Sequence, residues 1–269
     1  MTSGIDVSQW QGNIDWAKAK ASGQVEFALI RAGYGDTLSY PRQIDTQYER
    51  NYSECKRLGI PVGVYFYCYA MNEAEAKREA ECCLALLKGK QFEFPIFYDV
   101  EEYDLFRSGK TAEVCRAFVK VLEDAGYWVG IYTYRSAMKY FPADIKDKKA
   151  FAIAEYGSKL NYSGQYGIWQ NSSTWYVDGI NGRVDHDYCY VDYQKLIKEK
   201  GKNGYKAEFR VAATHGCYTY DGKDRPYVNG VYPTGAQWTV EKVVNHAGTD
   251  WGKIKGADKF VRMSDVKKV

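Results

Sequence analysis

The sequence predicts an α/β protein: an irregular β/α barrel of the TIM type followed by a small all-β domain. Between residues 4 and about 192, short β-rich apolar runs alternate with helical stretches, which is typical of a parallel β/α architecture. After residue 205, short alternating segments separated by Gly, Asn, Asp and Pro turns replace the helices. The length of 269 residues suits two unequal domains.

Eight apolar runs in the first part of the chain are predicted to be the barrel strands. They are rich in β-branched and aromatic residues, and each ends at polar or turn residues. By residue number they are 4–7, 27–31, 62–67, 95–100, 129–133, 151–154, 166–170 and 183–185. The gaps between the last three are too short and too polar for full helices. We therefore expect about five β/α units and then three strands joined mostly by loops.

Two of the intervening helices have readable beginnings. Asn72 and Glu75 can form a capping box ahead of an apolar stripe that reaches Leu87. Thr111 begins a second amphipathic helix, which Gly126 closes. Both apolar stripes are predicted to pack against the barrel.

A lysine-rich helical stretch, residues 193–203, marks the boundary between the two parts. The predicted organisation is a barrel domain over residues 1–195, a linker over 196–206 and the all-β domain over 207–269.

Composition limits the classes of function. The net charge of +3 comes from 37 basic and 34 acidic residues that are mixed along the chain, so we expect no nucleic-acid partner. No apolar run approaches the roughly 18 residues of a membrane span. The seven cysteines show no CxxC spacing and are expected to be buried thiols. The 25 tyrosines and 7 tryptophans suit stacking on sugars, or simply a core.

Four acidic residues fall at predicted strand ends: Asp6, Asp99, Glu101 and Asp185. In a β/α barrel the reacting groups lie where strands run into the following loops. Asp99 and Glu101 are two residues apart, so an extended strand places both on one face, about 7 Å apart at their Cα atoms. Glycoside hydrolysis needs such a pair, with one carboxyl protonated and the other ionised.

Other chemistries have less support in the sequence. No phosphate-binding Gly-rich loop or EF-hand accompanies the acids, so we expect neither a metal nor a cofactor. The three histidines are far apart in the chain, which argues against a Ser-His-Asp arrangement. His186, the one near the acids, is expected to have a structural or groove-lining role.

Several motifs in order carry a family resemblance. They lie at residues 4–12 (GIDVSQWQG), 27–32, 63–65, 98–101 (YDVE), 130–133, 168–170 and 184–185. With these, residues 3–192 resemble the glycoside hydrolase family 25 lysozymes, also called the Chalaropsis type.

The resemblance implies hydrolysis of the β-1,4 bond between N-acetylmuramic acid and N-acetylglucosamine in bacterial peptidoglycan, without a cofactor. Glu101 would be the general acid. Asp99 would assist, either by polarising the substrate acetamido group or more directly, and the stereochemical course stays open. Asp6 and Asp185 would complete the acidic pocket.

The resemblance also implies aromatic side chains along the substrate groove, and these would be Tyr65, Tyr67, Tyr132 and Trp169. The chain departs from the family at two places. Phe66 stands where the family often has His, and Asp187 stands where it often has Asn. Asp187 therefore competes with Asp185 for the fourth acidic role and is itself a candidate substrate-binding residue.

The tail resembles bacterial SH3-like wall-binding domains through residues 228–233, 237–240 and 250–254. Aromatic residues in such domains bind peptidoglycan stem peptides. The candidates are Tyr218, Tyr220, Trp238 and Trp251, although the two tryptophans could instead pack a small core.

The leading hypothesis is a phage endolysin or an autolysin. The N-terminus lacks the basic and apolar regions of a signal peptide, so we expect synthesis in the cytoplasm and action on the wall after release, or an extracellular protein if a signal has been removed. The alternatives are a non-catalytic peptidoglycan-binding protein and a barrel glycosidase acting on another amino-sugar polymer.

Overall fold

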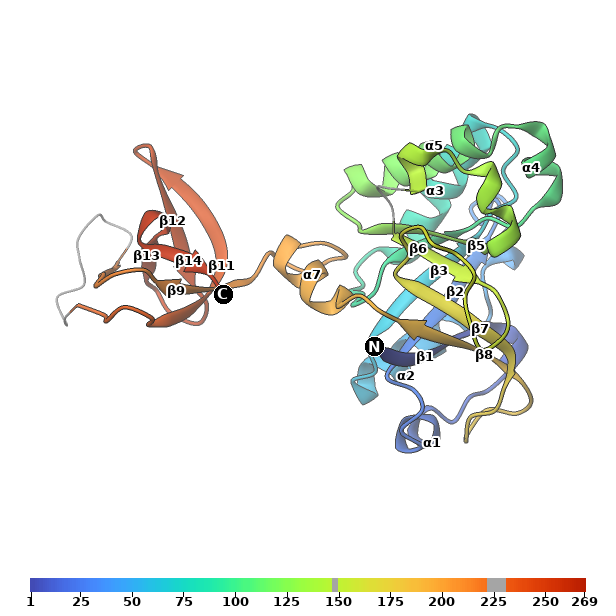
Figure 1. The fold of residues 1–269 in the computed structure, drawn as a ribbon, viewed down its shortest axis with the longest axis horizontal. Helices are drawn as coiled ribbons and strands as arrows, with labels where there is room; N and C mark the ends of the chain where they lie inside the picture. Colours follow the sequence, from blue (N-terminus) through green and yellow to red (C-terminus); the bar gives the residue numbers. More distant parts are fainter. Residues whose placement is uncertain (147–149, 222–230) are drawn as a thin grey trace. The chain divides into compact units, whose positions relative to one another are not determined.

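The computed structural model describes residues 1–146, 150–221 and 231–269. It divides into two compact units, Met1–Gln194 and Lys195–Val269 (Figure 1). Residues 228–230, the first part of one tail motif, lie outside the described residues.

The first unit is a closed barrel of eight strands. They are β1 (Thr2–Val7), β2 (Phe27–Tyr34), β3 (Val62–Tyr67), β4 (Ile96–Asp99), β5 (Val129–Tyr134), β6 (Ala150–Ala154), β7 (Ile168–Trp175) and β8 (Val184–Cys189). Strands β1 to β7 are parallel neighbours in chain order. The barrel prediction is confirmed.

The parallel architecture that the sequence predicted does not extend to the last strand. β8 closes the ring antiparallel to both β7 and β1. Residues 176–183, which join β7 to β8, are too few for the crossover that a parallel strand requires, so the chain turns back as a hairpin.

Helices occupy the connections between the first six strands, as expected. They are α1 (Trp16–Ala21), α2 (Tyr48–Leu58), α3 (Glu73–Leu87), α4 (Tyr103–Ser108), α5 (Thr111–Asp124) and α6 (Ala143–Lys146), with short 3-10 turns η1 (Gln9–Gln11), η2 (Pro41–Gln43) and η3 (Arg135–Tyr140). The Asn72 side chain caps α3 by accepting the Glu75 N–H at 3.0 Å. In Figure 1, α3, α4 and α5 lie on one side of the barrel and α1 on the other. In the described part of the chain, no helix is long and apolar enough to cross a membrane.

One end of the barrel interior is filled by aromatic rings. Phe27 and Phe94 stack with their centroids 4.4 Å apart, and both are buried. Glycines face these rings because a Cβ at Gly63 would lie 2.6 Å from the Cβ of Phe94, and a Cβ at Gly130 would overlap the Phe97 ring. This end is closed, so a pocket can open only toward the opposite end, where the parallel strands finish.

The second unit begins within α7 (Tyr193–Lys200), and its described residues form six strands and the 3-10 turn η4 (Met263–Asp265). The strands are β9 (Phe209–Ala213), β10 (Thr219–Tyr220), β11 (Gln237–His246), β12 (Thr249–Ile254), β13 (Phe260–Arg262) and β14 (Val266–Lys268). All pair antiparallel, in the order β10-β13-β12-β11-β9-β14. A small antiparallel all-β unit is therefore present, while its SH3-like character remains a prediction.

Candidate active site

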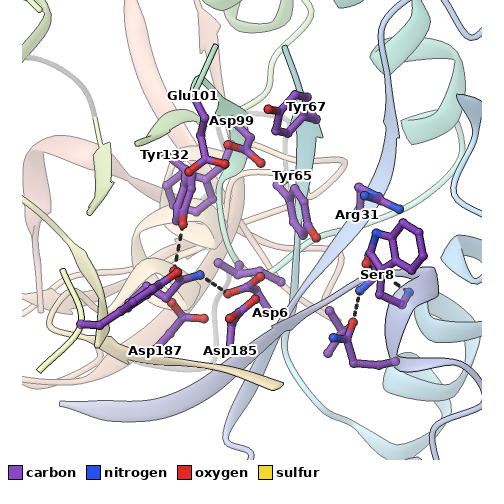
Figure 2. A pocket seen from close by; sticks show the side chains of 17 residues that line it. Asp6, Ser8, Arg31, Tyr65, Tyr67, Asp99, Glu101, Tyr132, Asp185 and Asp187 are labelled. Atoms are coloured by element: carbon purple, nitrogen blue, oxygen red, sulfur yellow. Dashed lines mark hydrogen bonds between the residues drawn. The ribbon is translucent and has the colours of Figure 1, made fainter. Parts of the chain in front are cut away.

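A pocket with a cavity volume of about 270 Å³ opens where the parallel strands end (Figure 2). Because alternate residues of a strand face the same side, β2, β4 and β7 carry inward side chains that are apolar deeper in the barrel, such as Leu29, Phe97 and Ile168, and polar near the mouth, such as Arg31, Asp99 and Gln170. Eight of the nine side chains predicted for the barrel site line this pocket: Asp6, Tyr65, Tyr67, Asp99, Glu101, Tyr132, Asp185 and Asp187.

Asp99 and Glu101 lie side by side on one wall of the pocket (Figure 2). Asp99 is the last residue of β4, is buried, and its Oδ1 has no hydrogen-bond partner among the described residues. Burial raises the pKa of Asp99, and the charge of Glu101 raises it further. Burial, and then the charges of Asp185 and Glu102, raise the pKa of Glu101 to about 7. The pair therefore retains a proton near neutral pH.

Asp185 reaches the pocket by a route that differs from the prediction. It was expected at the end of its strand, but it lies near the beginning of β8. Because β8 runs antiparallel to β1, its beginning lies beside the end of β1, where Asp185 pairs with Asp6 across the sheet. The prediction of Asp185 at the end of its strand was therefore wrong. Because β8 is antiparallel, Asp185 still lies beside Asp6, as the prediction of an acidic pocket requires.

Asp6, Asp185 and Asp187 form a second carboxyl group cluster opposite Glu101 (Figure 2). Burial raises the pKa of Asp6, as do the charges of Asp187 and Asp185. Burial raises the pKa of Asp185 to about 6 and raises that of Asp187, while hydrogen bonds from Asp6 oppose both shifts. Asp6 therefore favours the ionised forms of both neighbours. Asp187 is the deeper of the two, and only Asp185 acts on the pKa of Glu101.

Gln170 links the two sides of the pocket and was missed by the sequence analysis. Its Oε1 accepts the Tyr132 hydroxyl at 2.8 Å, and its Nε2 donates to Asp6 Oδ2 at 2.6 Å. It orients Asp6 within the cluster. The motif at residues 168–170 contained the signal, because alternation along β7 allows only one of two adjacent residues to face inward.

Trp169 is the residue that points away, so its predicted groove-lining role is wrong. It is 7% exposed and does not line the pocket. Its indole N–H donates to the Glu155 carbonyl at 2.8 Å, and its ring packs against Tyr188. Trp169 stabilises the outside of the barrel.

Arg31 is the one cationic side chain among the residues that line the pocket. Its Nε donates to Asp45 Oδ2 at 2.8 Å, and that buried carboxylate also accepts the Gln9 N–H at 2.9 Å. Of the influences on the pKa of Asp99, the charge of Arg31 is the one that lowers it. No influence lowers the pKa of Glu101. Arg31 therefore favours the ionised form of Asp99 over that of Glu101.

We predict that Arg31→Gln moves the acidic limb of the pH–activity profile to higher pH. Without the guanidinium, the pKa of Asp99 rises, so Asp99 is ionised only at higher pH. Arg31→Lys keeps a positive charge and should leave the limb closer to that of the wild type. The profiles of kcat/KM against pH for the three proteins test this, and a uniform loss of activity with unmoved limbs would contradict it.

The alkaline limb of the pH–activity profile should depend on the charge of Asp185. Activity that needs protonated Glu101 falls as the pH rises through about 7. Asp185→Asn removes a charge that raises this pKa, so the alkaline limb should move to lower pH. Asp187→Asn is the matched control, because Asp187 does not act on Glu101. Equal displacement of the alkaline limb in both variants would contradict the claim that Asp185, and not Asp187, raises the pKa of Glu101.

Exposed aromatic rings stand at the mouth of the pocket. Trp10 on η1 is 78% exposed, and Tyr156 after β6 is 59% exposed. Ser8 and Gln11 hold η1 through reciprocal capping bonds. Such rings offer faces on which sugars can stack. Trp10 lay within the first motif, but its exposure could be learned only from the fold.

A comparison with protein families decides the relationship. The model of glycosyl hydrolases family 25 matches residues 5–180. The chain belongs to this family. The matched residues include Asp6, Asp99 and Glu101.

Relatives of known name agree with the family 25 assignment. The autolytic lysozyme of Clostridium acetobutylicum is 32% identical over 186 residues, which cover 68% of this chain and 54% of the relative. The modular autolysin LytC of Streptococcus pneumoniae is similar in structure, with a TM-score of 0.60, 30% identity, and coverage of 69% of this chain and 46% of LytC. The catalytic domain of endolysin ply40 from a Listeria monocytogenes phage gives a TM-score of 0.61, 27% identity, and coverage of 74% and 97%. This chain thus spans about half the length of the autolysins.

His186 lies outside the pocket of this family 25 chain. Its Nε2 is 2.8 Å from Ser3 Oγ and its Nδ1 is 2.6 Å from Asn171 Oδ1. Its ring stacks on Trp175 with centroids 4.5 Å apart. His186 therefore joins β1, β7 and β8 on the outside of the barrel.

The four aromatic residues predicted to bind the wall differ in exposure. Tyr220 and Trp251 are buried against each other, with centroids 4.6 Å apart. Trp238 packs on the core of the second unit and contacts Tyr232. Tyr218 is 41% exposed and is the one of the four with an open ring.

Proposed function

We propose that this chain is an N-acetylmuramidase that hydrolyses the β-1,4 bond between N-acetylmuramic acid and N-acetylglucosamine in peptidoglycan. The observation that carries the proposal is the Asp99 and Glu101 pair in one pocket, with the pKa of Glu101 raised to about 7. Autolysins among the family 25 relatives support it, and LytC is known in complex with a synthetic peptidoglycan ligand.

In this proposal Glu101 is the general acid. It donates its proton to the glycosidic oxygen as the bond to the anomeric carbon breaks, and a water molecule finally supplies the hydroxyl at that carbon. Asp99 carries the compensating negative charge, either facing the anomeric carbon or polarising the substrate acetamido group. The charge of Asp185 helps to hold Glu101 in its protonated form, and Asp6, whose own pKa is raised, completes the acidic pocket.

The wider role follows from the two units. An enzyme of the endolysin or autolysin type acts on an insoluble polymer, and a wall-binding unit on the same chain raises the local concentration of the cutting unit. We infer that the second unit is such a wall-binding domain, with SH3-like character and the stem peptide as one candidate ligand.

Substrate comparison tests the proposal against its two rivals. We expect turnover of purified peptidoglycan and turnover of chitin oligosaccharides at least about a hundredfold slower, because a pocket shaped for the muramyl group discriminates by transition-state contacts. A barrel glycosidase for another amino-sugar polymer would prefer chitin. A binding protein without activity would retain peptidoglycan and release no fragments.

A further inference from the structure

The two units carry opposite charges. Residues 1–194 contain 22 Lys and Arg and 26 Asp and Glu, which gives a net charge of −4. Residues 195–269 contain 15 Lys and Arg and 8 Asp and Glu, which gives +7. The overall value of +3 conceals this difference. A strongly basic unit on an acidic enzyme indicates an anionic partner for that unit.

Three of the basic side chains of the second unit, Lys200, Lys206 and Lys242, line one surface hollow. We call it the lysine hollow, and its cavity volume is about 490 Å³. It lies between the segment that follows α7 and the middle of β11. Its lining residues are Lys200, Gly201, Tyr205, Lys206, Ala207, Glu241, Lys242 and Val243.

Backbone contacts fix the shape of the lysine hollow. The Glu208 N–H donates to the Lys198 carbonyl at 3.0 Å, and the Lys202 N–H donates to the Ile197 carbonyl at 3.0 Å. Gly201 has a φ of +60° and approaches Ala207 so closely that a Cβ would overlap its backbone. The end of α7 and the start of β9 are thus held together, and the hollow is a built feature.

The charges in the lysine hollow are uncompensated. Lys200, Lys206 and Lys242 are exposed, and among the described residues none of them forms an ion pair with a carboxylate. Glu241 is the one acidic side chain in the lining, and its Oε1 lies 3.5 Å from the ammonium of Lys253. Three ammonium groups around one concave surface, none paired with a carboxylate in the described part of the chain, form a site for a polyanion.

We propose that the lysine hollow binds a phosphate group of an anionic polyol-phosphate polymer attached to the bacterial wall. Ammonium groups are common phosphate binders in proteins and act as point charges, and the cations in this lining are all lysines. The partly exposed ring of Tyr205 can cover the polyol next to the phosphate. This inference rests on the proposed function for its wall partner and adds a second ligand besides the glycan strand.

The test uses the full chain carrying Glu101→Gln, so that walls are bound and not digested. The probe is purified wall material before and after removal of its phosphodiester polymers with hydrofluoric acid, and co-sedimentation measures the bound fraction. We expect Lys206→Gln with Lys242→Gln to bind phosphate-bearing walls about tenfold more weakly. The matched control is Lys267→Gln with Lys268→Gln, which removes the same charge from exposed positions on β14 and should change binding less than about twofold.

Three results would overturn the inference. Equal weakening by both double variants would show general attraction by charge. Undiminished binding of the parent protein to stripped walls would show that peptide or glycan is the ligand. Unchanged binding by the hollow variant would place the contact elsewhere. Hydrolysis of stripped walls by the wild-type enzyme tests the muramidase proposal separately, because no phosphate polymer remains there.

Discussion

Glu101→Gln is expected to lower kcat on purified peptidoglycan about a thousandfold while the protein stays folded. The amide cannot donate a proton to the leaving oxygen, and general acid catalysis typically contributes between about a hundredfold and ten-thousandfold. The side chain keeps its shape, so KM should change little. The rate of release of reducing ends, measured at pH 6, checks this result.

Glu102→Gln is the matched control for that experiment. Glu102 is the next residue along the chain, but its Oε1 accepts the Tyr67 hydroxyl at 2.8 Å and it does not line the pocket. We expect its kcat to stay within a few-fold of the wild type. If the two variants lost activity equally, the acid role would not belong to Glu101.

Asp99→Asn is expected to lower kcat between about a hundredfold and a thousandfold and at the same time to raise the melting temperature. The loss arises because a neutral amide cannot compensate positive charge at the anomeric centre. The gain arises because a buried carboxyl whose pKa is raised by burial destabilises the fold once it ionises. Since the folded-state pKa lies above the unfolded value, this penalty develops as the pH rises, so the stability gain should be larger at pH 8 than at pH 5.

Asp187→Asn separates the two effects on activity and stability. Asp187 is also buried, and its Oδ2 has no hydrogen-bond partner in the described part of the chain. This variant should gain stability in the same way but lose much less activity. Thermal unfolding at the two pH values, together with kcat, distinguishes the residues, and a fall in stability for Asp99→Asn would contradict the account.

The sequence was sufficient to predict the features that depend on local pattern. The strands of the barrel and the carboxyl groups at their ends follow from apolar runs that finish in acids, as at Asp6 and Asp99. The two-residue repeat of an extended strand predicted Asp99 and Glu101 on one wall, and both line the pocket although β4 itself ends at Asp99.

Other features depend on tertiary geometry. The direction of β8, which brings Asp185 to Asp6, is decided by a connection too short for a crossover. Gln170 faces inward and Trp169 outward because adjacent residues of β7 point to opposite sides of the sheet. A shift of the strand by one residue would exchange their positions, so the sequence alone does not decide which of the two faces the pocket. The influence of Arg31 on Asp99 acts between β2 and β4, which are separated by β3, and has no signature along the chain.

The difference in net charge between the two units was also not predicted from the sequence. Basic and acidic residues are mixed along the whole chain, so the total of +3 concealed the value of +7 for residues 195–269. The lysine hollow joins Lys206 to Lys242 across a long stretch of sequence, and no spacing rule predicts that proximity.

The most direct test of the central proposal is the identity of the sugar at the new reducing end. Fragments released from purified peptidoglycan by the wild-type protein are reduced with borohydride and analysed by mass spectrometry. The proposal predicts reduced N-acetylmuramic acid at the end of every new fragment, and no such fragment from Glu101→Gln. Reduced N-acetylglucosamine at those ends, or equal release by the variant, would contradict it.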